Sequence, residues 1–130
     1  MSLVGMPAHS AKFIDEYASD SKEEDAAQII PLNEDMYFPG MAVDYVAVQK
    51  GQHVRLHIHK KAQQLVIIMS GSGEGFLGKE KIKLVKGLVL RIPPTIPHSF
   101  HATQEKLEML AIQTPPIQHG NEERDTFFLE

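Results

Sequence analysis

The chain has 130 residues, a formal net charge of −4 and no cysteine. This length suits one domain with a sizeable core, and without cysteine a metal ion could be held only by His, Gln, Asp or Glu side chains. The acidic balance gives no basic patch for a phosphate backbone, and no apolar run approaches the ~20 residues of a membrane span. We therefore expect neither nucleic acid nor a membrane as a partner. The start of the chain lacks the blocks of a secretory signal, which favours a cytoplasmic protein.

Residues 1–28 are predicted to form a polar N-terminal arm. Within it the run from Ser10 to Gln28 is acidic, and Phe13, Ile14 and Tyr17 have the spacing of one helical face. A short helix, or an arm laid on the rest of the domain, would explain this spacing. A mobile leader fits the composition equally well.

Residues 29–119 are predicted to form the body of the domain, and residues 120–130 a C-terminal tail. The body consists of short β-rich runs separated by Gly and Pro-Pro turns. These runs are 41–49, 53–59, 64–69, 73–78, 81–85, 88–92, 98–102 and 106–114. Their spacing indicates an all-β, antiparallel sandwich or barrel and does not choose between the two.

The run 53–59 alternates between polar and apolar side chains. Successive side chains of a strand point to opposite faces, so one face is predicted to carry His53, Arg55, His57 and His59. An apolar face exposed to water would be unfavourable, so the polar face is expected to line a cavity. There His57 and His59 can place two imidazoles on one metal ion.

The run 64–69, QLVIIM, is apolar on both faces, which implies cover on both sides. Since a barrel has only one interior, a second subunit is expected to cover the other face, and we predict a homodimer. Cover by the N-terminal arm is the alternative.

Two parts of the chain resemble the paired motifs of the cupin superfamily, G(X)5HXH(X)3-4E(X)6G and G(X)5PXG(X)2H(X)3N. In the first motif the matching residues are Gly51, His57, His59 and Gly71, with Gln64 in the place of the usual glutamate. In the second they are Gly87, Pro93 and His98, with Thr95 in the place of the usual glycine and Ala102 in that of the asparagine. The resemblance covers roughly the central half of the chain and implies a small double-sheet jelly-roll barrel over 29–119.

The resemblance also implies a metal centre held by His57, His59, Gln64 and His98. The expected cofactor is one divalent transition metal, Zn, Ni, Fe, Mn or Co. Gln63 is the alternative fourth ligand, but counting back from Gly71 selects Gln64. This ligand set is neutral, so a bound ion would keep its full charge, and Gln64 cannot serve as a proton-accepting base.

Further roles follow from the predicted cavity face. Arg55 is expected to hold the carboxylate of an acidic substrate, with an ordinary salt bridge at the barrel mouth as the alternative. His53 lies farther out on the same face and is a candidate general base or a residue of the rim. Phe100 has the parity of His98 and is expected to give the cavity an apolar wall.

The run 106–120 resembles the last strand and Pro-Pro turn of small cupins that act on unsaturated uronic sugars and use a His, His, Gln, His metal set. Where those proteins carry an acidic residue, an aromatic residue and an arginine, this chain has Ala111, Gln113 and Ile117. The resemblance implies a metal-dependent isomerase or lyase acting on a small polar substrate such as a sugar acid. An Fe(II)-dependent dioxygenase and a non-catalytic small-molecule-binding or sensory barrel are the alternatives.

Overall fold

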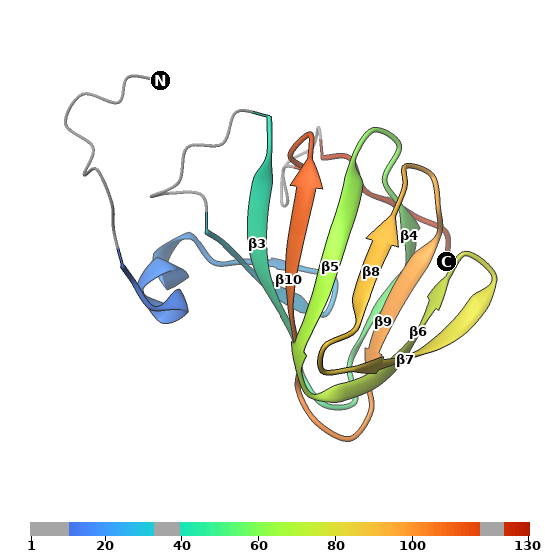
Figure 1. Ribbon diagram of the computed structural model, residues 1–130, viewed down its shortest axis with the longest axis horizontal. Helices are drawn as coiled ribbons and strands as arrows, with labels where there is room; N and C mark the ends of the chain where they lie inside the picture. The colour runs from blue at the N-terminus through green and yellow to red at the C-terminus, as the bar shows by residue number, and fades with distance from the viewer. Residues whose placement is uncertain (1–10, 33–39, 118–123) are drawn as a thin grey trace.

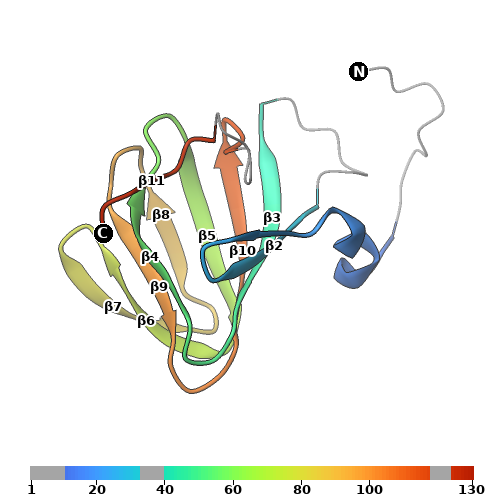
Figure 2. The ribbon, with the colours of Figure 1, turned by 180° about the vertical axis from the view of Figure 1, so that it is seen from behind.

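The computed structural model describes residues 11–32, 40–117 and 124–130, and in these ranges the chain forms two antiparallel sheets that face each other (Figures 1 and 2). The first sheet has the order β1 (Lys22–Glu24), β2 (Ala27–Pro31), β3 (Ala42–Val48), β10 (Leu107–Thr114), β5 (Gln63–Ser70), β8 (Val89–Ile92). The second has the order β11 (Phe127–Phe128), β4 (His53–Ile58), β9 (His98–Ala102), β6 (Ser72–Leu77), β7 (Glu80–Val85). Every run predicted to be β-rich overlaps one of these strands, so the all-β jelly-roll fold is confirmed.

The N-terminal segment packs against the outer face of the first sheet. It forms a 3-10 helix, η1 (Ile14–Asp20), which lies beside β3 in Figure 1. Tyr17 of this helix is buried with Ile30, Tyr45 and Ala47. The same segment continues into β1 and the start of β2, and the tail at 120–130 contains β11. Both ends of the chain therefore add strands to the barrel.

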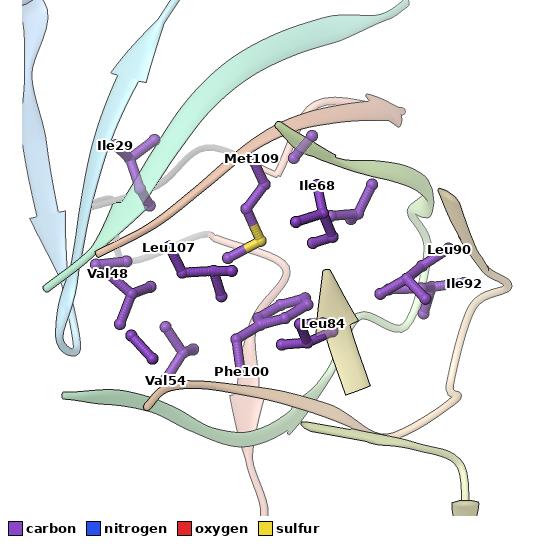
Figure 3. Packing of buried hydrophobic residues seen from close by; sticks show 14 residues of the cluster. Ile29, Val48, Val54, Ile68, Leu84, Leu90, Ile92, Phe100, Leu107 and Met109 are labelled. Carbon is purple, nitrogen blue, oxygen red and sulfur yellow. The ribbon is translucent and has the colours of Figure 1, made fainter. Parts of the chain in front are cut away.

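The hydrophobic core lies between the sheets, where inward residues of both interdigitate (Figure 3). Val48, Leu107 and Met109 of the first sheet meet Leu84 and Phe100 of the second, and none of them is more than 7% exposed. Burying each such side chain contributes about 1.5–3 kcal/mol relative to leaving it in water. This packing fixes the two sheets relative to each other and so provides a rigid frame for a site.

The inward rows change from apolar to polar along the strands. On β9 the order is Ala102, Phe100, His98, and on β10 the row that begins at Leu107 ends at Gln113, all of them buried. Polar interior residues therefore collect at one end of the barrel, where β9 begins and β10 ends. The candidate site lies at this end.

Glycines of the two cupin motifs occupy turns that other residues would strain. Gly71 and Gly87 have φ values of +90° and +92°, in the left-handed region. A Cβ atom at Gly71 would also lie 2.0 Å from the carbonyl oxygen of Lys106. The match of these motifs therefore reflects backbone geometry as well as ligand spacing.

A β-bulge in β4 overturns the predicted face of its first half. Val54 pairs with Phe100 and His57 pairs with His98, and the register shifts between the two pairs. The extra residue lets Val54 and His57 both point inward, although strict alternation would place them on opposite faces. The prediction that His53 and Arg55 share the cavity face with His57 is therefore wrong.

In the described part of the chain, no helix has the length and apolar character needed to cross a membrane.

Candidate metal centre

Three histidines converge at the polar end of the barrel. His57 and His98 face each other across the β4–β9 pair, with ring centroids 4.2 Å apart, and His59 follows the end of β4. Their ligand atoms all lie within 4.8 Å of one another, and each residue is at most 6% exposed. Two separate stretches of sequence thus supply one compact cluster of imidazoles.

Backbone carbonyl groups fix the ring orientation of all three histidines. The Nδ1 atoms of His57, His59 and His98 lie 2.7, 2.6 and 2.9 Å from the carbonyl oxygens of Arg55, Asp125 and Ile96. Because a carbonyl oxygen only accepts a hydrogen bond, each Nδ1 carries a hydrogen, and in the neutral form of such a ring the lone pair is on Nε2. This arrangement of a carbonyl behind the ring is typical of histidines that bind metal through Nε2.

The environment of His98 favours a neutral imidazole. Burial lowers the pKa of His98 well below its ordinary value, and the neighbouring His57 and His59 lower it further. The Nε2 atom of His98 is buried and has no hydrogen-bond partner among the described residues. A neutral imidazole with an unused lone pair is the form that binds a metal ion.

Gln64 approaches from the facing sheet. It points inward from β5 and is 9% exposed, whereas the neighbouring Gln63 is exposed. Gln64 lines the same pocket as His57 and His59, and its Oε1 atom is buried without a partner in the part of the chain that is described. Three imidazole nitrogens and one amide oxygen fit a divalent transition metal, and two of these four donors, His98 Nε2 and Gln64 Oε1, have no hydrogen-bond partner among the residues that the structure describes.

A narrow pocket leads to the cluster. Its walls are mainly apolar and include Val54, Val66, Phe100, Met109 and Phe128. The volume is about 60 Å³, enough for a few water molecules or a small ligand. Phe100 therefore lies where its strand parity predicted.

Two acidic residues of the β1–β2 hairpin also line the pocket, and each is paired with an arginine. Glu24 lies 3.1 Å from Arg124, and Asp25 lies 2.9 Å from Arg55. Burial alone would raise the pKa of Asp25, but hydrogen bonds from the backbone and side chain of Arg55 lower it on balance. The sequence prediction missed both acids because they belong to the segment interpreted as an arm.

Arg55 and His53 lie outside this pocket. Arg55 has a side chain that is 42% exposed, pairs with Asp25 and packs 4.1 Å over the ring of Phe128. His53 is exposed and contacts His101 on the outer face of the second sheet. Arg55 therefore supports the pocket wall from behind through Asp25 and Phe128.

The C-terminal strap, defined here as residues 124–130, completes the site. The carboxylate of Asp125 accepts hydrogen bonds of 2.8 Å from the backbone N–H groups of Lys60, Lys61 and Ala62. These bonds lower the pKa of Asp125 although burial alone would raise it. Since the carbonyl group of Asp125 also holds His59, the strap fixes a candidate ligand that no sequence motif connects to it.

Two antiparallel sheets around a cluster of buried histidines define a small jelly-roll barrel with a candidate metal centre. The chain belongs to the cupin family, because residues 44–113 match the model described as Cupin domain.

Individual relatives agree with this assignment. An uncharacterized protein of Methanocaldococcus jannaschii, MJ1618, is 31% identical over 77 residues, which are 58% of this chain and 62% of that protein. The match thus spans less than two thirds of this relative's length. Ectoine synthase from P. lautus has a TM-score of 0.73 at 18% identity and covers 94% of this chain and 91% of its own. KdgF from Halomonas sp. has a TM-score of 0.69 at 19% identity, and the match covers 84% of this chain and 97% of KdgF. At these identities the two structures show a shared fold.

Proposed function

We propose that this protein is a metal-dependent cupin enzyme that converts a small polar molecule by isomerase or lyase chemistry. One divalent transition metal, Zn, Ni, Fe, Mn or Co, would be held by His57, His59, Gln64 and His98. The observation that carries this proposal is the pair of buried donors without partners among the described residues, His98 Nε2 and Gln64 Oε1. When bound, the ion supplies Lewis acidity toward a carbonyl, hydroxyl or enol oxygen.

Glu24 is the candidate acid–base group of this proposal. Its side chain is 10% exposed, lines the pocket and is paired with Arg124. A carboxylate at this place can accept a proton from a substrate carbon or hydroxyl and return it to another atom. Thr126 adds a hydroxyl group at the same pocket, and its buried Oγ1 has no partner among the described residues.

The lining of the pocket favours a neutral substrate over an acidic one. Within the described chain the lining contains two acids and no lysine or arginine, and Arg55 lies behind the wall. A carboxylate would find no cationic side chain in this lining and could be held only by the ion itself. We therefore propose a small neutral polyol or sugar-like molecule, rather than a sugar acid, whose apolar edge packs on Phe100 and Phe128.

A second candidate is an Fe(II)-dependent dioxygenase. The neutral ligand set favours it, because three histidines and an amide leave the full charge on the ion and the apolar walls exclude water. Oxygen uptake by the iron-loaded protein with small diketones or catechols tests it. Oxygen consumption with these compounds would replace the isomerase or lyase assignment.

Metal analysis of protein purified without a His tag tests the site. We expect about one transition-metal ion per chain in the native protein and a large loss in His57→Ala. His53→Ala is the matched control, because His53 lies on the same strand outside the cluster, and it should keep the native metal content. Native metal content in His57→Ala would contradict the proposed site.

Turnover assays test the chemistry. Glu24→Gln should retain the metal and lose at least ~100-fold in the rate of proton transfer, the usual contribution of a general acid–base group. A panel of neutral sugars and unsaturated uronates tests the substrate class. Turnover of the uronates alone would contradict the preference for a neutral substrate.

A further inference from the structure

Resting on the proposed metal site, we propose that Asp44 and Gln113 form a hydrogen-bond relay that turns the amide oxygen of Gln64 toward the histidine cluster. Asp44 and Gln113 are then positioning residues, because they act on the ion only through Gln64. Neither residue belongs to the two cupin motifs.

The relay runs across three neighbouring strands of the first sheet, β3, β10 and β5 (Figure 1). Gln113 Nε2 donates to Asp44 Oδ2 at 2.5 Å, and Gln64 Nε2 donates to Gln113 Oε1 at 3.3 Å. Gln113 and Gln64 are direct cross-strand partners. Asp44, Gln113 and Gln64 are 3%, 1% and 9% exposed, so water does not compete for these bonds.

The direction of the relay follows from the chemistry of its first member. A carboxylate oxygen accepts hydrogen bonds, and Asp44 Oδ2 accepts one from the NH2 group of Gln113. The carbonyl oxygen of Gln113 must then face Gln64, and Gln64 donates a hydrogen bond to it from its own NH2 group. Only the Oε1 atom of Gln64 remains, and this atom has no hydrogen-bond partner in the described part of the chain.

The direction matters because an amide has two different ends. A reversed Gln64 would present N–H groups to the pocket, and these cannot bind a cation. The two orientations of an amide are similar in shape, so packing alone distinguishes them poorly. The buried carboxylate of Asp44, at the far end of the relay, distinguishes the two orientations of the Gln64 amide. Burying this carboxylate has a desolvation cost that an apolar residue would avoid.

Cobalt(II) titration followed by visible absorption, in competition with a chelator, measures the affinity that the relay should control. Asp44→Asn gives the relay an end that can either donate or accept, and Gln113→Leu breaks the relay while keeping the charge of Asp44. We expect each to weaken cobalt binding about 10- to 100-fold, the usual effect of groups that orient ligands. The double variant Asp44→Asn/Gln113→Glu exchanges carboxylate and amide, keeps the net charge and again accepts from Gln64. It should bind within about threefold of the native protein, by the same logic of donors and acceptors.

Glu108→Gln is the control for charge, because Glu108 lies on β10 but bonds to Tyr45 and Ser70 on the outer face. It should leave cobalt affinity unchanged. Circular dichroism of the metal-free proteins checks that each variant is folded. If a single variant does not fold, the cobalt affinity of the double variant tests the relay.

Native affinity in folded Gln113→Leu would overturn the relay while leaving the metal site in place. A double variant as weak as Asp44→Asn would overturn it as well, since the loss would then not depend on amide direction. Failure of the native protein to bind cobalt would overturn the proposed function, and the relay with it.

Discussion

At the scale of single residues, Thr95 occupies a strained position. Its φ of 70° lies in the left-handed region, which β-branched residues rarely adopt, and the cupin motif has glycine there. We expect Thr95→Gly to raise the free energy of unfolding by about 1 kcal/mol, because the released strain exceeds the added chain entropy. The backbone hydrogen bond from Thr95 to His59, 2.7 Å long, is kept in this variant.

Urea denaturation measures this difference. Gly71→Ala is the matched opposite, since it adds a Cβ atom where the chain has no space, and it should be strongly destabilising. A lower stability of Thr95→Gly than of the native protein would show that the threonine side chain stabilises this turn.

Glu108 gives the protein an acid-sensitive contact. Hydrogen bonds from Tyr45 and Ser70 lower the pKa of Glu108. The pKa of Tyr45 is raised, mainly by burial and further by its hydrogen bond to Glu108. Because the folded pKa lies below the unfolded value, this stabilisation is present above about pH 4.5 and is lost as the pH falls through the folded pKa. Glu108→Gln should therefore cost about 1–2 kcal/mol at pH 7 and much less at pH 3. Unfolding free energies of both proteins at the two pH values check this, and an equal difference at both would contradict it.

At the scale of elements, the strand β4 shows that strict alternation of side chains does not always predict which residues share a face. His57, His59 and His98 lie together, as the two motifs indicated, because motif spacing measures positions relative to the ligands themselves. Arg55 does not share their face, because a bulge inserts one residue before His57. A bulge depends on pairing with β9, which no local pattern records.

The C-terminal strap is predicted to hold the loop that carries His59. Removing the Asp125 carboxylate leaves three backbone N–H groups of residues 60–62 without their acceptor, which should cost about 1–3 kcal/mol. We expect Asp125→Ala to increase hydrogen exchange at residues 60–62. Glu130→Ala, at the end of the same strap, should increase exchange at Leu56 only, since Glu130 accepts from that N–H group. Unchanged exchange at residues 60–62 would show that the strap does not restrain the loop.

At the scale of the whole molecule, the first sheet carries an apolar row across its outer face. Cross-strand pairing connects Tyr45, Leu110, Ile67 and Val89 in this order. The helix η1 covers the end near Tyr45, but Val89 and the nearby Leu65 are 53% and 37% exposed. The arm thus covers only part of the face, and we propose that a second copy of the chain covers the rest.

Light scattering tests this homodimer. The native protein should have twice the chain mass of 14.5 kDa, and Leu65→Lys/Val89→Lys should have the mass of one chain, because buried lysines without partners oppose association. Phe76→Lys is the control, since Phe76 is 46% exposed on the second sheet and should not affect the mass. A native mass of one chain would contradict the proposed dimer.

The sequence by itself determined the barrel and the histidine cluster, because glycine turns, strand length and ligand spacing are local properties written in consecutive residues. The motif spacing also selected Gln64 rather than Gln63 as the inward residue, and Gln64 is the buried one of the two. Only the tertiary structure decided what surrounds the cluster. Glu24 comes from the predicted arm, Asp125 from the predicted tail, and the relay partner Asp44 from a strand without any motif. These groups meet through the pairing of strands distant in sequence, and that pairing depends on the packing of the whole barrel rather than on any single segment.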